Sequence, residues 1–265
     1  MAKVIYERQG AIGVLTLNRP EVHNAIDPES AAAIRNALGE FQTDRDARAL
    51  VVTGAGERSF SSGADLKLAH HLRENPVTEE VGPLGFARLD PGKPTVAAVN
   101  GYCFAGGMEL AAWCDFRIAA ANAEFGVLNR RWGIPLIDGG TQRLPAIVGL
   151  GNALYLMETG VRIDARRAFE MGFVQEVVPE GRALQRALEL ADRIVRYPSR
   201  GLLADRRSAL AGLGEPLKAG LRREAELGVP LLGDPEVAAA LDGYARGDRP
   251  PPPRGWTGDP ERMGS

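Results

Sequence analysis

The sequence predicts an α/β fold, and three features of its pattern support that class. Apolar, β-branched runs at residues 49–53 and 94–99 are typical of buried strands. Each run leads through a glycine-containing loop into the start of a helical pattern, so a strand–loop–helix unit occurs twice. From Asn152 onward the pattern is mostly helical, which predicts a helical appendage on the α/β core.

The first elements follow from local signals. Residues 3–7 and 12–17 both alternate between apolar and polar side chains and are separated by a glycine, which predicts a β-hairpin. Asp27 followed by Pro28 is typical of a helix start, because aspartate caps free amide groups and proline fits the first turn. We therefore expect the chain to open with a hairpin and an amphipathic helix.

The stretch at residues 100–115 combines glycines with a carboxylate. It leads through Gly106 and Gly107 into an apolar helix. Glycines let a ligand approach the backbone, and the first amide groups of a helix are unpaired at its positive end. Glu109 would lie in the first turn, beside a backbone that can stabilise developing negative charge. The alternative is a surface Glu109 that only complements the helix dipole.

Residues 70–92 form the least regular part of the predicted core. The segment is polar and contains three prolines, which predicts either a mobile cover for a substrate or a surface excursion. His70 and His71 lie here, but paired surface histidines are common and a catalytic histidine needs a partner. The remaining core elements are expected as strands at 116–119, 124–126 and 174–178 and helices at 141–147, 164–172 and 180–196.

The chain is expected to divide near residue 197. Residues 1–197 form the α/β core, and residues 198–265 form a helical region. Its helices are expected at 199–212, 215–228 and 235–246. They have little core of their own, so they would bury their apolar faces on the main domain or on a neighbouring subunit. The tail around Pro250–Pro253 is expected to be extended or disordered.

Composition narrows the classes of partner and compartment. A formal net charge of −2 provides no basic field, so we expect no nucleic-acid partner. No apolar run is long enough to span a membrane, and the N-terminus lacks a signal-peptide core, so we expect no membrane partner. Cys103 and Cys114 match no metal-ligand spacing, so no metal site is expected. A reducing cytoplasm is the simplest compartment.

The order and spacing of several short motifs resemble the crotonase superfamily, the enoyl-CoA hydratase/isomerase family, over nearly the whole chain. The motifs are Asn18-Arg19-Pro20 with Asn24-Ala25, Phe60 to Leu66, Asn100 to Asp115, Phe125-Gly126, Gly139 to Leu144, and Ala168 with Met171-Gly172. The resemblance implies a ClpP/crotonase-type spiral of ββα units with a C-terminal helical region that assembles homotrimers, often paired as hexamers. It also implies an acyl-CoA thioester substrate, so coenzyme A belongs to the substrate and no separate cofactor is expected.

The resemblance also implies which residues form the site. An oxyanion hole would use the main-chain N–H groups of Ala64 and Gly106, and such a donor typically lowers a barrier by ~2.7–4 kcal/mol. The positions that would contact substrate or coenzyme A are Val22, His23, Ser62, Gly63, Asp65, Leu66, Gly107 and Pro135. Family members often carry a basic residue in the region where this chain has Glu21, Val22 and His23, so contacts to the nucleotide phosphates are expected to differ there.

Hydratases of the family use two glutamates, and this chain matches one of them. Glu109 falls on the first position, whereas the second falls on Asn129. An amide can orient a water molecule but cannot exchange a proton at neutral pH. Asp138 lies just before the glycines of the next motif and can supply the second carboxylate, because two carboxylates in an apolar pocket separate into an acid and a base.

Asp138 and its neighbours also have ordinary structural explanations. Asp138 can pair with Arg131 or Arg143, or cap the helix that begins near Thr141. Arg130 and Arg131 can be solvated surface charges, or recognise an acidic acyl substituent.

The predicted function is an enoyl-CoA hydratase-like lyase in fatty-acid or related acyl-CoA metabolism. Glu109, Asp138 and Asn129 are the candidate catalytic residues. The alternatives are another crotonase-type reaction (isomerisation, decarboxylation or thioester hydrolysis) and a coenzyme A binding protein with little turnover. Family isomerases usually keep their carboxylate at the position of Asn129, so the isomerase alternative does not follow simply from losing a glutamate.

Overall fold

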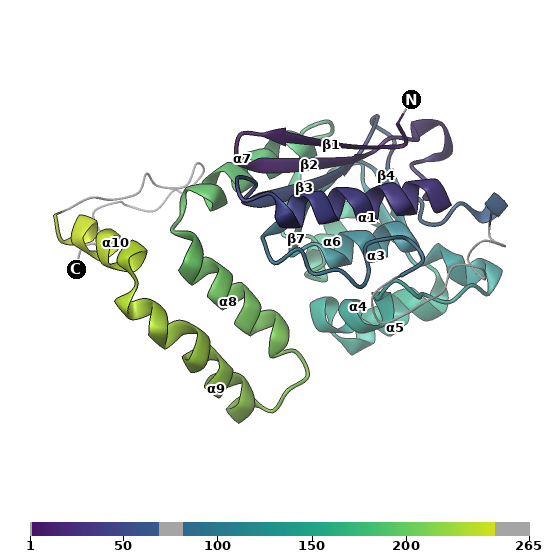
Figure 1. Cartoon of the computed structure of the whole chain (residues 1–265). Coiled ribbons are helices and arrows are strands. Elements are labelled where there is room, and N and C mark those ends of the chain that lie inside the picture. Colours follow the sequence, from purple (N-terminus) through teal and green to yellow (C-terminus); the bar gives the residue numbers. More distant parts are fainter. Residues whose placement is uncertain (1, 69–81, 247–265) are drawn as a thin grey trace. The chain divides into compact units, whose positions relative to one another are not determined.

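The computed structural model describes residues 2–68 and 82–246 (Figure 1). The described residues up to Tyr197 form one compact unit, and those from Pro198 onward form a second. The strands are β1 Val4–Gln9, β2 Ile12–Leu17, β3 Ala49–Gly54, β4 Ser59–Ser61, β5 Thr95–Val99, β6 Tyr102–Phe104, β7 Phe116–Ala120, β8 Glu124–Gly126, β9 Ile163–Asp164 and β10 Glu176–Val178. The α-helices are α1 Pro28–Thr43, α3 Gly106–Trp113, α4 Gly140–Val148, α5 Leu150–Thr159, α6 Ala165–Glu170, α7 Ala183–Arg196, α8 Ser199–Ala211, α9 Leu217–Gly228 and α10 Pro235–Ala245. Short 3₁₀ turns are η1 Pro20–Val22, η2 Leu66–Leu68, η3 Leu128–Trp132 and η4 Val229–Gly233.

Two sheets run through the first unit. The larger sheet has the strand order β1-β2-β3-β5-β7-β10, and the smaller has the order β4-β6-β8-β9. In the larger sheet β1 and β2 form the predicted antiparallel hairpin, while every other neighbouring pair is parallel. Parallel strands need crossover connections, and here the crossovers pass through the second sheet and the helices.

The predicted strand–loop–helix unit lacks a second, short strand that the structure contains. The loops after β3 and β5 contain the short strands β4 and β6, which pair with each other in the second sheet. Strands β7 and β8 repeat this arrangement, so the unit occurs three times as strand, strand and helical turn. Strands β4 and β6 are held by pairing with each other, which the local pattern at 59–61 and 102–104 did not indicate. The spiral of ββα units is confirmed.

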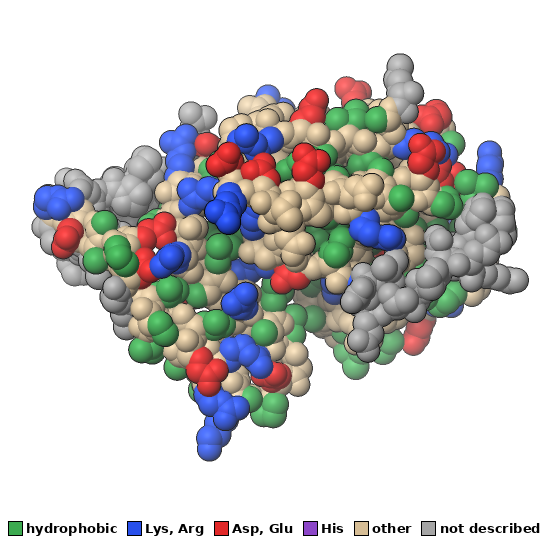
Figure 2. Space-filling view, viewed as in Figure 1, with side chains coloured by type: hydrophobic (Ala, Val, Ile, Leu, Met, Phe, Trp, Pro, Cys, Tyr) green, Lys and Arg blue, Asp and Glu red, His purple; other side chains and the backbone are tan. Residues whose placement is uncertain are grey.

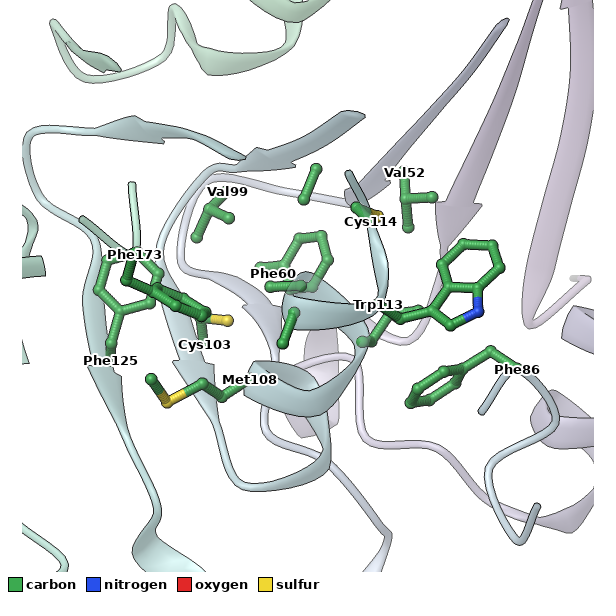
Figure 3. Close-up of a cluster of buried hydrophobic side chains, with 14 of the residues drawn as sticks. Val52, Phe60, Phe86, Val99, Cys103, Met108, Trp113, Cys114, Phe125 and Phe173 are labelled. Atoms are coloured by element: carbon green, nitrogen blue, oxygen red, sulfur yellow. The ribbon is translucent and has the colours of Figure 1, made fainter. Parts of the chain in front are cut away.

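The larger sheet is covered on both faces. One face contacts α7 through a row of small side chains, Ala183, Ala187 and Ala191, which are at most 1% exposed and let the helix approach closely. The other face contributes to the main core with α1 and α3. Aliphatic side chains make up most of that core, and aromatic and sulfur-containing ones, with Met108 of α3 among them, pack between them (Figure 3). This burial fixes the first turn of α3 in place.

The N-terminal predictions are confirmed by local contacts. Asp27 caps α1, because its Oδ1 accepts a hydrogen bond of 2.8 Å from the Ser30 N–H. The stripe Ile34, Leu38 and Phe41 is at most 2% exposed and packs into the main core.

Residues 82–90 are not a surface excursion, which corrects one interpretation of the 70–92 segment. Leu84, Phe86 and Ala87 are buried, and Phe86 meets the ring of Trp113 edge-on at 6.2 Å (Figure 3). The Trp113 Nε1–H donates to the Leu89 carbonyl at 2.8 Å, which ties this segment to α3. His70 and His71 lie outside the described residues, as do Pro250–Pro253.

The second unit is a set of helices with little internal core. Helices α8 and α9 lie side by side and run in opposite directions (Figure 1), and neither buries a residue. Glu236 at the start of α10 accepts a hydrogen bond of 3.0 Å from the Ser199 N–H at the start of α8. Assigning catalysis to the first unit and self-association to the second stays a prediction. No helix in the described ranges is long and apolar enough to cross a membrane.

Candidate active site

A pocket of about 200 Å³ opens in the first unit, where the ends of several crossovers meet. Eight residues predicted from the sequence line it: Ser62, Ala64, Leu66, Gly106, Glu109, Asn129, Pro135 and Asp138. The wall is mainly apolar, and none of its described residues is Lys or Arg. The pocket therefore brings two carboxylates into an environment that disfavours charge.

Two glycine loops meet at one wall. A Cβ built on Gly63 would lie 2.6 Å from the Gly106 nitrogen, so only glycine permits this approach. A Cβ built on Gly106 would lie 3.6 Å from the Ala64 nitrogen, which places the two loops side by side. Ala105, which precedes α3, has φ of 50°, a strained value for a residue with a side chain. The main-chain nitrogens of Ala64 and Gly106 thus border the same space.

Glu109 is held at the base of the pocket by main-chain donors. It lies in the first turn of α3 and is 3% exposed. Its Oε1 accepts hydrogen bonds from the Asp138 N–H at 2.9 Å and the Gly140 N–H at 2.8 Å. Burial raises the pKa of Glu109 to about 7, against the lowering effect of the Gly140 hydrogen bond, and the nearby Asp138 charge also raises it. The interpretation of Glu109 as a surface residue is therefore wrong.

Asp138 is the second buried carboxylate, at 2% exposure. Its Oδ1 accepts a hydrogen bond of 3.1 Å from the Leu84 N–H. Burial raises the pKa of Asp138 to about 6, although the Leu84 hydrogen bond and the charges of Arg88 and Arg143 lower it. Two carboxyl groups of one pocket thus have raised and different pKa values, which is the arrangement expected of an acid and a base.

Arginine pairing and helix capping, the two structural explanations for Asp138, do not account for its carboxylate. Arg143 Nη1 donates to the main-chain carbonyl of Asp138 at 3.1 Å, rather than to its carboxylate. Helix α4 begins after Gly139 and has no side-chain cap, so the capping explanation is wrong. Arg131 Nη2 donates to the Gly160 carbonyl at 3.4 Å, beyond the end of α5.

Asn129 lines the pocket but makes a structural contact of its own. Its Nδ2 donates to the Ile134 carbonyl at 2.7 Å, and the Ile134 N–H donates to the Asn129 carbonyl at 3.2 Å. This pair of bonds closes the turn that contains η3. The Asn129 Oδ1 is buried without a hydrogen-bond partner among the described residues. The catalytic role of Asn129 stays a prediction, and the contact with Ile134 was not foreseen.

The predicted coenzyme A residues are only partly brought together. The Ser62 N–H donates to the His23 carbonyl at 3.0 Å, which joins the two predicted binding segments. The Asp65 carboxylate forms an ion pair of 3.0 Å with Arg19. The residues Val22, His23, Gly63, Asp65 and Gly107 do not line the pocket. Gly107 is packed behind it, where a Cβ would lie 2.2 Å from the Ser61 carbonyl oxygen.

Seven lining residues were not predicted: Leu84, Phe104, Ala105, Leu128, Trp132, Ile134 and Ile137. Most are apolar residues of loops or short elements, which carry no periodic signal. The neighbouring apolar residues Leu84, Phe86 and Ala87 were a usable hint, because such a run is unusual in a polar surface segment. No group of three or more His, Cys, Asp or Glu in residues 2–68 and 82–246 is arranged to hold a metal ion.

The fold and the site together define a class of α/β protein, in which two touching glycine loops meet a pair of buried carboxylates in an apolar pocket. The model of the enoyl-CoA hydratase/isomerase family matches residues 7–245. The short-chain-enoyl-CoA hydratase of Clostridium acetobutylicum is 40% identical over 198 residues, 72% of this chain and 75% of that protein. The crotonyl-CoA hydratase of Syntrophomonas wolfei is 40% identical over 212 residues, 78% of this chain and 80% of that protein.

Solved structures agree with these relatives. The crystal structure of enoyl-CoA hydratase EchA1 from Mycobacterium marinum matches with a TM-score of 0.87 and 30% identity. The match covers 94% of this chain and 98% of that one. The chain belongs to the enoyl-CoA hydratase/isomerase family and has the crotonase fold. It is therefore a hydratase-like, acyl-CoA-processing enzyme of the crotonase family.

Proposed function

We propose that this enzyme adds water across the 2,3 double bond of an enoyl-CoA thioester, with Glu109 and Asp138 as its two proton-exchanging groups. The observation that carries the proposal is that both carboxyls are buried in one apolar pocket, beside the Ala64 and Gly106 loops. The relatives named above are hydratases of enoyl-CoA thioesters, which agrees with that chemistry.

The main-chain donors stabilise the intermediate in this proposal. Attack of water on C3 moves charge onto the thioester oxygen, and the N–H groups of Ala64 and Gly106 bind that oxygen. Gly106 N also lies at the N-terminal end of α3, where the helix dipole favours negative charge. Fixed donors in a water-poor pocket do not reorganise during the reaction, which is why such groups contribute strongly.

In this proposal the two carboxyl groups take different roles, Asp138 as the base and Glu109 as the acid, which agrees with the order of their pKa values. Between pH about 6 and about 7 Asp138 is ionised and Glu109 is protonated. Asp138 takes a proton from water, the water oxygen bonds to C3, and Glu109 gives its proton to C2. Main-chain donors occupy Glu109 Oε1 and Asp138 Oδ1, so the exchanged protons lie on Oε2 and Oδ2. A proton passing from Asp138 to Glu109 resets the pair, and the scheme uses no cofactor.

The direct test is hydration of crotonyl-CoA, measured as loss of the conjugated thioester absorbance and a product heavier by one water. Turnover with binding of the thioester in the same preparation supports the proposal. Tight binding without any product contradicts it and favours a binding protein. A product of unchanged mass or the release of free coenzyme A identifies isomerisation or thioester hydrolysis instead, and loss of carbon dioxide from an acidic acyl group identifies decarboxylation.

We further propose that the second unit mediates self-association into a trimer or a dimer of trimers. Helices α8 and α9 bury none of their residues. Large apolar side chains are exposed on these helices and on the loop between them, at Leu210, Leu213, Leu217 and Leu221. Light scattering on the whole chain and on a Leu217→Gln, Leu221→Gln variant tests this, and a monomeric wild type contradicts it.

We propose that the enzyme works in the cytoplasm. We also propose that it has no nucleic-acid or membrane partner. Two buried free thiols, Cys103 and Cys114, support a reducing compartment. Basic and acidic side chains are interspersed on the face shown in Figure 2, which supports the expectation drawn from the net charge. Fractionation of cells that express the chain tests the compartment.

A further inference from the structure

Trp132 belongs to the pocket wall and is also in contact with solvent. The residue is 74% exposed although it lines the pocket. Leu66, another lining residue, is 44% exposed, whereas Glu109 and Asp138 are at most 3% exposed. This gradient of exposure defines a buried end that holds the carboxyl groups and an apolar mouth formed by Leu66 and Trp132.

The turn that carries Trp132 is held by hydrogen bonds of the residues before it in the sequence. The Asn129 amide bonds to the Ile134 carbonyl across the turn at 2.7 Å. Arg130 Nε donates to the Met157 carbonyl at 3.1 Å, and Arg131 Nη2 donates to the Gly160 carbonyl at 3.4 Å. Both arginines thus meet carbonyl groups at or just beyond the end of α5, where the helix dipole favours positive charge.

These contacts also answer what the two arginines do. Their guanidinium groups bond to main-chain carbonyls, and neither residue lines the pocket. The described wall contains no basic side chain, so it offers no ion pair to an acidic acyl substituent. The chemistry of the wall and mouth fits an unsubstituted hydrocarbon chain.

We propose that Trp132 determines acyl-chain length, by packing against the part of a long acyl chain that the 200 Å³ pocket cannot enclose. The proposal rests on the proposed function only in taking an acyl-CoA thioester as the ligand. A buried methylene contributes ~0.8 kcal/mol, which corresponds to about fourfold in affinity. A chain that reaches the indole therefore gains affinity with each added methylene, until it passes the ring.

The kinetic test compares wild type, Trp132→Ala and Trp132→Phe with linear 2-enoyl-CoA thioesters of four to twelve carbons. We expect the alanine variant to lose at most about twofold in kcat/KM with the shortest thioester and about tenfold or more with the longest. The loss should lie in KM rather than kcat, because this contact is equal in ground and transition states. The phenylalanine variant should recover most of it. Phe169→Ala, a 51% exposed aromatic of α6 outside the pocket wall, is the matched control.

A binding series separates this proposal from the proposed function. Calorimetry with saturated acyl-CoA thioesters of the same lengths needs no turnover, and the affinity loss in Trp132→Ala should again grow with length. If wild type hydrates none of the series, the hydratase proposal fails while the binding series still decides the role of Trp132. An equal loss at every length assigns the indole to the coenzyme A arm and overturns the proposal. No loss at any length, or a change in oligomer mass measured by light scattering, also overturns it.

Discussion

The two sides of the pocket differ in the chemistry that they allow. The carboxylate side, Glu109 and Asp138, consists of buried groups whose pKa values are raised to about 7 and about 6. The amide side, Asn129 with the turn η3, has no titratable group in the wall and uses its amide to close the turn onto Ile134. The titratable groups of the described pocket wall thus lie on one side.

The difference shows how a second carboxyl group can enter the pocket from another motif position. The closed turn runs from Asn129 to Ile134, and Asp138 follows four residues later with its N–H on Glu109 Oε1. The same backbone that positions Glu109 therefore brings the second carboxyl into the pocket. A buried acid needs a neighbouring base in space, and its position along the chain is irrelevant to that requirement.

Removing the acid of the carboxylate side should have the largest effect. Glu109→Gln keeps an oxygen that can accept from Asp138 and Gly140 but cannot donate a carboxyl proton. We expect kcat for crotonyl-CoA hydration to fall by about 10³, with thioester affinity within about threefold of wild type. Rapid-quench kinetics and calorimetry measure the two quantities. Glu57→Gln, at an exposed position, is the control, and a variant that keeps a tenth of wild-type kcat would remove Glu109 from the chemistry.

Removing the base should cost somewhat less and change the pH profile. Asp138→Asn can still accept the Leu84 N–H, and we expect kcat to fall by about 10². In wild type, kcat/KM should fall below pH about 6 as Asp138 gains a proton and above pH about 7 as Glu109 loses one. The variant should lose the acid limb. Its alkaline limb should move to lower pH, because the Asp138 charge that raises the pKa of Glu109 is gone. An unchanged acid limb would assign it to another group.

Displacing the carboxylate without changing it should have an intermediate effect. A Cβ at Gly140 would lie 2.9 Å from Glu109 Cγ and 3.0 Å from its Oε1. Gly140→Ala should therefore move the carboxyl group and lower kcat by about tenfold, since small misplacements of reacting groups are costly. Gly151→Ala, which meets no atom within 4 Å, is the matched control. Equal activity in both variants would show that the position of Glu109 is not critical.

Changes on the amide side should have the smallest effect on rate. Asn129→Glu places the family carboxylate at its usual position but breaks the bond to Ile134. We expect kcat to fall about fivefold or less, and the free energy of unfolding to fall by about 1–2 kcal/mol, as for a lost buried hydrogen bond. Asn129→Ala should match it in both measurements, by steady-state kinetics and urea unfolding. A rate above wild type in Asn129→Glu would show that proton transfer still belongs to position 129.

Much of the fold was predictable because its signals are local. Asp27 and Pro28 mark the start of α1, and the glycines at 106 and 107 mark the start of α3, since caps and glycine turns depend on adjacent residues. The short strands β4 and β6 were missed, although the equally short β8 was predicted, because a three-residue strand has a weak pattern of its own and depends on its partner. The same reason hid the packing of residues 82–90 on Trp113.

Part of the candidate site was also predictable from the sequence. The sequence indicated Glu109, Ala64 and Gly106 as one group and raised Asp138 as a second carboxylate, from residue types beside glycine loops and from the resemblance to a family. It also determined the α/β class and the membership of nearly the whole chain in one family. These properties depend on order and spacing along the chain, which a sequence contains directly.

The tertiary structure alone decided what those groups can do. It buried Glu109 and Asp138 together, and that burial raises both pKa values, which no spacing could show. In the structure the Asn129 amide donates to the Ile134 carbonyl, and Arg130 and Arg131 donate to main-chain carbonyls. Trp132 has an exposed position at the pocket mouth. Desolvation and hydrogen-bond partnership are properties of surroundings, and the surroundings of these residues come from segments distant in the sequence.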